Sequence, residues 1–535
     1  MATTEDERRS LLPPPTTEQR GSYDALHQAK PSSIKILVPP PSQQSTLCNC
    51  ECDCECERGV PIITSIHLHS PRHQHSLSPS HRGISSTAAS SVPIAVLMTF
   101  MTLFMSVVGA GLLSIPFTFT CAPVSVVVTC LVLVGLAMGY TAELLVRVHI
   151  ATNVFTYARR FPSHHLSSSF RRFNGLAEVA FGSVFSKVVS ATTIFAILGA
   201  CVGCIEIVAD LSPFLVHLVG LDNTSYHPTS IVLPLFIAGI YPLTLLKKIT
   251  ALRFSSYVGF VASMYLVVAV TCRASSFSAS SRASSAANNN HSTVVRPPSY
   301  DNLPLKVAHI VSVFNYAFVS HLNVIPLFAT LQHATPSQLL FVLGPLPSKA
   351  KTGQPGLMWM RVVIYTMSLF CIGMYAVFGT HAMALYGNHV QGNILLNLEH
   401  DRVMDVPRLA VLVTILFSFP LLFHPFRMLV ESFALQLVGC ESKILPRSVQ
   451  AAESLVLLLV VVAVATAMPG IQITFSLTGA SCVTLICYVF PVLCYLRLCP
   501  HDSALRRGIA VVIGVFGLAT GIVATGLVLT GTTVV

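Results

Sequence analysis

Polar and titratable residues inside long apolar segments are the first feature of this sequence that could support chemistry. His321 lies in the apolar run 305–330, together with Asn315, Ser320 and Asn323. Polar side chains within a lipid-spanning segment are costly and usually face a pathway for a solute. Because histidine titrates near neutral pH, His321 is a candidate proton carrier.

Two carboxylates near the end of the apolar run 187–211 are further candidates for a proton relay. They are Glu206 and Asp210. The alternative for Glu206 is a hydrogen bond between helices, and the alternative for Asp210 is an anchor at the membrane surface. Glu143 is interpreted as the ion-pair partner of Arg147, four residues further on.

Small residues interrupt the first apolar run, 94–118. Gly109, Ala110 and Gly111 lie mid-run, and Pro116 follows. Glycine weakens a helix and lets the backbone open. In lipid an opened backbone persists only beside a protein cavity or water, and its freed polar groups can then hold a carboxylate and an ammonium. For the glycines alone, close packing of helices through small residues is the alternative.

The two interruptions occupy corresponding places, since they fall in the first and the sixth of eleven apolar runs. Such a pair indicates a midplane binding site in a transporter built from inverted repeats. The predicted substrate-binding residues are Gly109, Ala110, Gly111, Ser320, His321 and Asn323.

The eleven apolar runs predict an all-α, multi-pass membrane protein. The chain is 53% hydrophobic and 10% charged, whereas soluble domains carry roughly 25% charged residues. Each run is long enough to cross roughly 30 Å of hydrocarbon. The predicted spans are 94–118, 124–146, 187–211, 229–246, 254–272, 305–330, 358–383, 408–430, 450–468, 472–496 and 508–530.

Positive charge predicts the orientation. Of the 32 Lys and Arg residues, eighteen fall in or beside loops on the side of the N-terminus and six on the other. This asymmetry predicts a cytosolic N-terminus and, with eleven spans, a C-terminus outside or in a lumen. Two glycosylation motifs, at Asn223 and Asn290, fall in loops predicted to lie outside. The net charge of +10 forms no basic stripe with interleaved aromatics, so nucleic-acid binding is not expected.

Six segments, in order, resemble the amino acid/auxin permease family, which includes sodium-coupled neutral amino-acid transporters and yeast vacuolar amino-acid transporters. The segments are VVGAGLLSIPFTF in the first run, NGLAEVAFG at 174–182, YPLTLLKKITALRFSS at 241–256, NYAFVSHLNVIPLF at 315–328, YGNHVQGNILLNL at 386–398 and PRLAVLVTILFSFPLLFHPFR at 407–427. The resemblance implies a core like that of the leucine transporter (LeuT), with two inverted five-helix repeats and one extra helix. It also implies amino-acid transport by alternating access.

The resulting organisation has five parts. They are a disordered cytosolic tail at 1–92, a first inverted repeat at 93–272, a flexible non-cytosolic loop at 273–303, a second inverted repeat at 304–497, and a loop with the last helix at 498–535.

One position departs from the sodium-coupled members of the family, which usually carry Asn four residues before the first glycine of the GxG motif. Met105 stands there in this chain, and a thioether is a poor ligand for a hard cation. Sodium could still use backbone carbonyls and the hydroxyl of Thr414 or Ser418. We expect coupling to protons, through His321 or Glu206, or exchange, in preference to sodium, and no other cofactor.

The tail carries short motifs. Glu7, Leu11 and Leu12 match an acidic dileucine sorting signal, and Tyr23 with Leu26 matches a tyrosine-based one. Both predict binding to clathrin adaptors and an endolysosomal or vacuole-like membrane, with the plasma membrane as the alternative.

A cysteine-rich run in the tail has three open interpretations. Cysteines alternate with other residues, and histidines follow. Soft-metal binding, palmitoylation and a biased disordered tract are the interpretations. The cysteines are Cys48, Cys50, Cys52, Cys54 and Cys56.

The predicted function is a secondary transporter of small neutral amino acids in a lipid bilayer. An amino-acid sensor that signals through its tail is the alternative. An enzyme is not expected, since the sequence shows no nucleophile–base set, phosphate loop or catalytic metal motif.

Overall fold

The computed structural model describes residues 91–152, 168–220, 227–245, 253–287, 303–334, 355–399, 401–438 and 446–530. The chain divides into units 1–82 and 83–535, and every described residue lies in the second. The regular elements in these ranges are all helical. The tail motifs, the cysteine-rich run, Asn223 and Asn290 lie outside the described residues.

Nine helices in the described ranges are long and apolar enough to cross a membrane, and one bent pair makes a tenth candidate. A shorter apolar helix, α8 (Pro228–Thr244), corresponds to the fourth predicted span. The helices of the other uninterrupted spans are α3 (Val124–Thr152), α6 (Ser183–Asp210), α9 (Arg253–Ala287), α13 (Pro355–Tyr386), α15 (Asp405–Val438), α16 (Arg447–Ala467) and α19 (Ala504–Leu529).

The first predicted span is interrupted where the glycines lie. It consists of α1 (Ser91–Val107), the 3-10 helix η1 (Ala110–Ser114) and α2 (Ile115–Cys121). The two halves are bent by 51°. Gly109 joins them with φ −117° and ψ −145°, which is not a helical conformation.

The sixth predicted span is also interrupted. α10 (Leu303–Ala317) ends one turn before α11 (His321–Ala334) begins. The amide of Phe318 still donates to the Phe314 carbonyl at 3.0 Å, and the amide of Asn323 donates to the Ser320 carbonyl at 2.9 Å. The regular helical hydrogen-bond pattern is broken in the three residues between the end of α10 and the start of α11.

The tenth predicted span widens in its middle. α17 (Ile471–Thr478) runs into two π-helical turns, η5 (Gly479–Val483) and η6 (Leu485–Val489), and then into α18 (Phe490–Leu498). The Thr484 hydroxyl donates to the Gly479 carbonyl at 2.9 Å. Such π-helical turns within α-helices occur frequently at functional sites.

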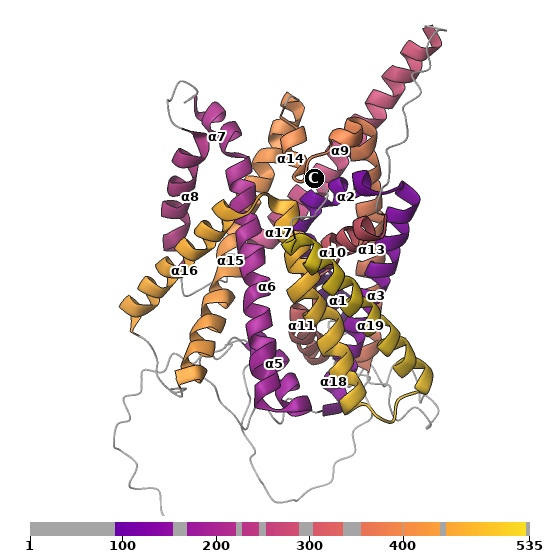
Figure 1. Cartoon of the computed structure of the whole chain (residues 1–535), viewed down its shortest axis with the longest axis vertical. Coiled ribbons are helices and arrows are strands. Elements are labelled where there is room, and N and C mark those ends of the chain that lie inside the picture. The colour runs from indigo at the N-terminus through magenta and orange to yellow at the C-terminus, as the bar shows by residue number, and fades with distance from the viewer. Residues whose placement is uncertain are drawn as a thin grey trace, which may run out of the picture. The chain divides into compact units, whose positions relative to one another are not determined.

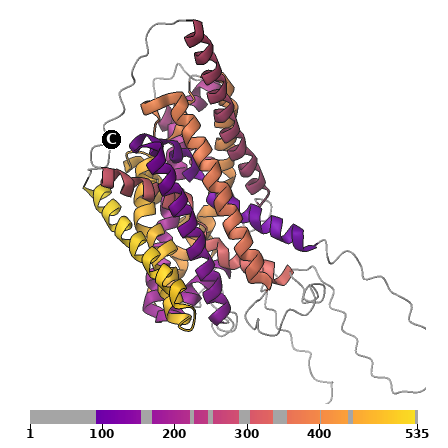
Figure 2. The ribbon, with the colours of Figure 1, turned by 90° about the vertical axis from the view of Figure 1, so that its right-hand side faces the viewer.

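The helices pack in two groups. In the first group, α13 contacts α1, α3 and α11, and α3 also contacts α10 and α11; in the second group, α6, α8, α15 and α16 all contact one another. In Figure 1 most of the first group lies on the right and α8, α15 and α16 on the left, with α6 between them. Figure 2 shows the first turns of α1 projecting from the other helices, which agrees with the exposure of Ile94, Leu97 and Met98.

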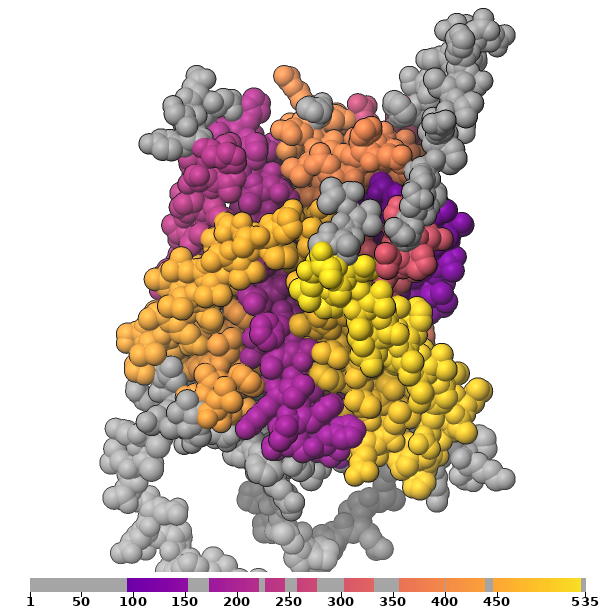
Figure 3. Space-filling view, in the orientation of Figure 1, coloured from indigo at the N-terminus to yellow at the C-terminus, as the bar shows by residue number. Residues whose placement is uncertain are grey.

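The helices differ in how much of their apolar surface is buried inside the protein. In α16 and α19 only 22% of the apolar window is buried, against 72% for α10 with α11. Figure 3 shows α16 in orange and α19 in yellow on one face, with part of α6 in magenta between them. Exposed apolar helices are expected to face lipid, so α10 and α11 lie where a solute site would be enclosed.

Three short helices lie outside the predicted spans. α5 (Ser168–Phe181) packs against α6, α11 and α18, in a segment that was expected to be a loop. α7 (Ser212–Val219) packs against α8, and α14 (Ile394–Asn397) lies against η1. These helices are too short to be predicted as membrane spans.

Candidate functional site

A cavity of about 380 Å³ lies between the two interrupted spans. Its walls come from α1, η1, α6, α9, α10, α11, α15 and η5, together with the residues that break the two spans. Among the described residues, no Asp, Glu, Lys, Arg or His side chain lines it. The volume is within the range of small-molecule sites, about 300–1,000 Å³.

Five of the six predicted substrate-binding residues line this cavity. They are Gly109, Ala110, Gly111, Ser320 and Asn323. Helix ends leave backbone amides and carbonyls without partners in their own helix. The interruptions therefore bring main-chain polar groups from two distant parts of the sequence to one cavity.

The structure places the sixth residue, His321, outside the cavity. Its side chain is fully buried, and Nε2 lies 2.9 Å from the Thr141 hydroxyl on α3. Nδ1 has no hydrogen-bond partner among the described residues. Successive helical residues point about 100° apart, so Asn323 faces the cavity while His321 faces α3.

A side-chain hydrogen bond links the two interrupted spans beside the cavity. Asn323 Nδ2 on α11 donates to Ser106 Oγ on α1 at 2.7 Å. Both residues line the cavity. The bond therefore holds the end of α1 against the start of α11.

Thr414 and Ser418, the alternative candidate hydroxyls for a sodium ion, both line the cavity. The Thr414 hydroxyl donates to the Ala410 carbonyl of its own helix at 2.8 Å. A β-carbon on Gly259 would lie 2.9 Å from the Thr414 methyl group and 3.0 Å from Met105 Cε. Two methyl groups therefore converge on Gly259 where α1, α9 and α15 meet.

Glu206 and Asp210 lie behind the cavity wall. Cys204 and Ile207 line the cavity, whereas Glu206 does not. Glu206 Oε1 accepts a hydrogen bond from the Thr474 hydroxyl at 2.9 Å. Asp210 Oδ2 accepts one from Asn393 Nδ2 at 3.0 Å.

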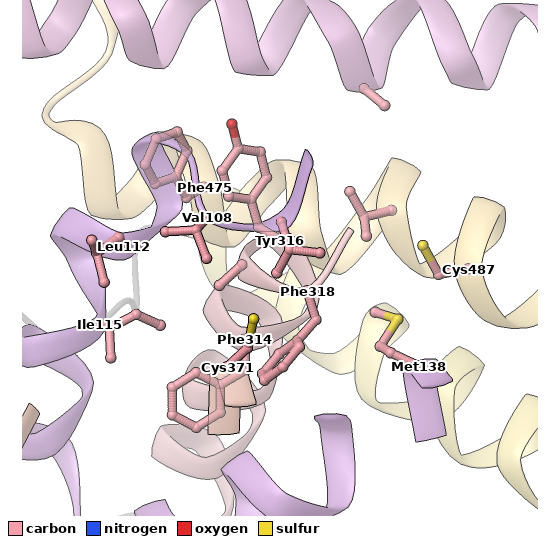
Figure 4. Packing of buried hydrophobic residues seen from close by; sticks show 14 of the residues in the cluster. Val108, Leu112, Ile115, Met138, Phe314, Tyr316, Phe318, Cys371, Phe475 and Cys487 are labelled. Atoms are coloured by element: carbon pink, nitrogen blue, oxygen red, sulfur yellow. The ribbon is translucent and has the colours of Figure 1, made fainter. Parts of the chain in front are cut away.

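An aromatic stack forms beside the cavity, and the sequence did not indicate it. The rings of Tyr316 and Phe475 lie 4.1 Å apart at 12° (Figure 4). Tyr316 lines the cavity, and a β-carbon on Gly111 would lie 3.2 Å from its ring. No spacing in the sequence relates residues so far apart.

Small residues of α6 form another part of the wall. Ala196, Ala200 and Cys204 line the cavity at intervals of four residues. This spacing puts them on one face of the helix, and it is a signal that the sequence contained.

The predicted pair of Glu143 and Arg147 is confirmed, at 2.7 Å. Arg361 on α13 also binds Glu143 at 2.7 Å, and the Tyr365 hydroxyl donates to it at 3.0 Å. Glu143 therefore joins α3 to α13, away from the cavity-lining residues.

Comparisons with known proteins agree with this architecture. A family model described as "Transmembrane amino acid transporter protein" matches residues 93–343 and 349–530. The chain is 24% identical to Vacuolar amino acid transporter 6 of Saccharomyces cerevisiae, over 61% of this chain and 64% of that protein. It is 27% identical to Amino acid transporter AVT3A of Arabidopsis thaliana, over 80% of this chain and 87% of that protein.

A further relative is much longer. The chain is 21% identical to Putative sodium-coupled neutral amino acid transporter 10 of Xenopus laevis, over 74% of this chain. The match spans 34% of that protein and, as stated, 64% of the Saccharomyces one. The matched part therefore covers less than two thirds of each of these two relatives.

Proposed function

The chain belongs to the family of transmembrane amino acid transporter proteins, and from this membership we propose that it is a secondary carrier of small neutral amino acids that works by alternating access. The family and the matched relatives are transporters, not enzymes. One observation carries the proposal: a cavity between two interrupted spans, with main-chain polar groups at both interruptions.

The charge of the cavity wall supports neutral substrates. An α-amino acid brings one carboxylate and one ammonium, and the ends of interrupted helices can hold both. A charged substrate side chain would need a further counter-charge, because burying an unpaired charge is very costly. Among the described residues, no Asp, Glu, Lys, Arg or His lines the cavity to supply it.

Eleven spans are part of the proposal, with α8 as the fourth. Its 17 residues give a helix about 26 Å long, slightly shorter than the roughly 30 Å of an average hydrocarbon core. Bilayers accommodate short helices by local thinning at modest cost. α8 packs against α6, α15 and α16, all of which pass the length criterion.

The packing pattern supports two five-span repeats. If each span is exchanged with the span five places later, pairs of helices that contact each other become other pairs that also contact each other. The contact of α1 with α13 corresponds to that of α10 and α11 with α3, and the contact of α6 with α16 corresponds to that of α15 with α8. Likewise, the contact of α9 with α13 corresponds to that of α18 with α3, and the contact of α9 with α15 corresponds to that of α17 with α6. Because five is odd, the second repeat starts on the opposite side of the membrane. An inverted LeuT-type core is therefore part of the proposal. α10 begins at Leu303, next to the predicted boundary at 304, whereas α9 continues as a helix to Ala287 and so extends past the predicted boundary at 272 into the segment predicted as a loop.

We propose coupling to protons, or exchange, in place of sodium. The place where a hard cation would need oxygen ligands is instead occupied by the methyl groups of Met105 and Thr414 beside Gly259.

A vacuolar or endolysosomal membrane is the proposed location. The Saccharomyces relative, and one from Schizosaccharomyces pombe that is 22% identical over 80% of its length, are named vacuolar transporters. The sorting motifs near Leu12 and Tyr23, with clathrin adaptors as partners, also predict such a membrane. A cytosolic N-terminus and glycosylation at Asn223 and Asn290 remain predictions as well.

Flux in proteoliposomes tests the function. The purified full chain is reconstituted, and counterflow of labelled alanine, serine, leucine, lysine and glutamate is measured with and without proton and sodium gradients. We expect counterflow of neutral amino acids, little of lysine or glutamate, stimulation by a proton gradient and none by sodium. Absence of flux for every amino acid would reject the carrier, and preferred lysine or glutamate flux would reject the neutral-substrate assignment.

A further inference from the structure

Two carboxylates lie one turn apart at the end of α6, beside the cavity. Glu206 and Asp210 share a helix face because four residues separate them. Each binds a different element: Glu206 accepts from Thr474 on α17, and Asp210 from Asn393, which precedes α14. The pair thus contacts two segments, α17 and the residues before α14, that are far from α6 in the sequence.

These two segments also contact the substrate-facing helices. Gly392, next to Asn393, accepts a hydrogen bond from Ser114 Oγ of η1 at 3.0 Å through its carbonyl. Phe475, next to Thr474, stacks on Tyr316 of α10. In the proposed topology this end of α6 is the non-cytosolic end, so both carboxylates bind segments that lie on that side of the membrane.

Glu206 is enclosed with an unsatisfied oxygen. Its residue is 5% exposed, and Oε2 has no hydrogen-bond partner among the described residues. An ionised carboxylate can accept about four hydrogen bonds, and among the described residues Glu206 accepts one, from Thr474. Burying the charge in this way is costly, whereas the neutral acid tolerates it far better.

No cation compensates the pair in the described part of the chain. The titratable neighbours of Glu206 are Asp210, Cys201 and Cys204 on its own helix and Tyr316 on α10. Arg408 on α15 lies 3.6 Å from Asp405 and 4.2 Å from the centre of the Phe214 ring.

Glu453 on α16 interacts electrostatically with Glu431 and Arg427 of α15. In the described ranges, no other charged side chain on a helix that packs against α6 forms a hydrogen bond or ion pair with Glu206. The neighbours of Glu206 therefore add negative charge or none.

We propose that Glu206 and Asp210 form a proton-operated latch on the non-cytosolic gate, which closes over the cavity with the proton bound at Glu206. The proposal rests on the proposed function. With the gate open, water reaches the pair and a proton from the non-cytosolic solution adds to the Glu206 carboxylate. Closure onto Thr474 and Asn393 encloses the neutral acid, and the proton leaves to cytosolic water after the cavity opens there.

The latch makes the closed state bind the proton more tightly than the open state, which is the differential affinity that coupling requires. Glu206→Gln imitates the neutral acid and retains an acceptor for Thr474. It should close without a proton, so exchange continues while proton-driven accumulation is lost.

The test compares two assays on reconstituted full-length protein: labelled-alanine counterflow without a gradient, and accumulation driven by a two-unit pH step. For Glu206→Gln we expect counterflow within about twofold of wild type and pH-driven accumulation lowered at least about tenfold, since one pH unit is worth a factor of ten per proton. Asp210→Asn should shift the pH at which accumulation is half-maximal. The matched control is Glu453→Gln, a carboxylate on α16 that should retain the wild-type response.

The outcomes separate the two proposals. If wild type shows no flux, or flux without response to pH, the proposed function or its coupling fails. If wild type responds and Glu206→Gln responds equally, the latch is overturned. Loss of counterflow together with accumulation in Glu206→Gln, while the more conservative Glu206→Asp keeps the wild-type response to pH, also overturns it, because the residue would then have only a structural role.

Discussion

Asn323 and Ser106, which are 217 positions apart in the sequence, form a 2.7 Å hydrogen bond beside the cavity. It connects the end of α1 with the first turn of α11, so the two interrupted spans are held together by side chains as well as by packing. Alternating access requires helices around the cavity to change partners. A bond at this place should therefore stabilise one conformation over the other.

Removing this bond should favour separation of α1 and α11. Ser106→Ala deletes a hydrogen bond worth about 1 kcal/mol, which corresponds to about a fivefold shift in a two-state equilibrium. Spin labels at positions 97 and 330, both exposed, would report it as a larger population of long distances. Thr102→Ala is the control, because that hydroxyl donates within α1 to the Met98 carbonyl. An unchanged distance distribution in Ser106→Ala would contradict the assignment.

The two glycines of the first interruption should differ in tolerance. A β-carbon on Gly111 would lie 3.2 Å from both Ala317 Cα and the Tyr316 ring, whereas one on Gly109 would meet nothing within 4 Å. Overpacking costs about 1–3 kcal/mol. We expect Gly111→Ala to slow alanine counterflow about tenfold, and Gly109→Ala to stay within about twofold of wild type.

The measurement is the initial rate divided by the amount of reconstituted protein. Equal losses at the two positions would show that flexibility of the interruption, and not the contact with Tyr316, is what the glycines supply.

Sodium dependence should appear when Met105 is replaced by Asn. The amide oxygen would supply a hard ligand next to Thr414 and Ser418, where wild type has a thioether. We expect sodium to raise alanine uptake by Met105→Asn at least about threefold, which corresponds to at least about 0.65 kcal/mol. Met105→Leu, which adds no ligand, should remain insensitive to sodium. Sodium stimulation of wild type itself would refute the proposed coupling.

Asp502, in the connection between α18 and α19, should make stability depend on pH. Burial alone would raise the pKa of its carboxyl, but hydrogen bonds from Arg506, the Tyr495 hydroxyl and the Ser503 amide outweigh this and lower the pKa below its ordinary value of 3.8. A carboxyl of lowered pKa stabilises the fold fully above 3.8, and this contribution is lost as pH falls through the folded-state pKa.

Asp502→Asn should therefore lower the melting temperature at pH 7 by about 1–2 °C, the effect of a partly exposed ion pair. The difference from wild type should shrink below pH 4. The melting temperature can be measured in detergent, at a series of pH values, as the temperature at which the heated protein stops being monodisperse. Glu178→Gln on α5 is the control, and a constant difference across pH would exclude the carboxylate as its cause.

The sequence predicted the long apolar helices and which two of them are interrupted, but not the short helices α5, α7 and α14 or the π-helical turns of the tenth span. Apolar length and charge composition are local properties, so they could be read from 94–118 and 305–330 without a structure. The same interrupted apolar runs predicted that Gly109, Gly111, Ser320 and Asn323 line a binding site. The family resemblance, confirmed by the family match over 93–343 and 349–530, rested on ordered motifs.

Tertiary structure decided where side chains point and what they meet. His321 faces Thr141 and not the cavity, because its direction depends on where α11 resumes its helical turn. Tyr316 meets Phe475, and Asn393 meets Asp210, only because helices far apart in the chain pack together. Side-chain contacts of this kind depend on the relative placement of whole helices, which no local pattern of residues encodes.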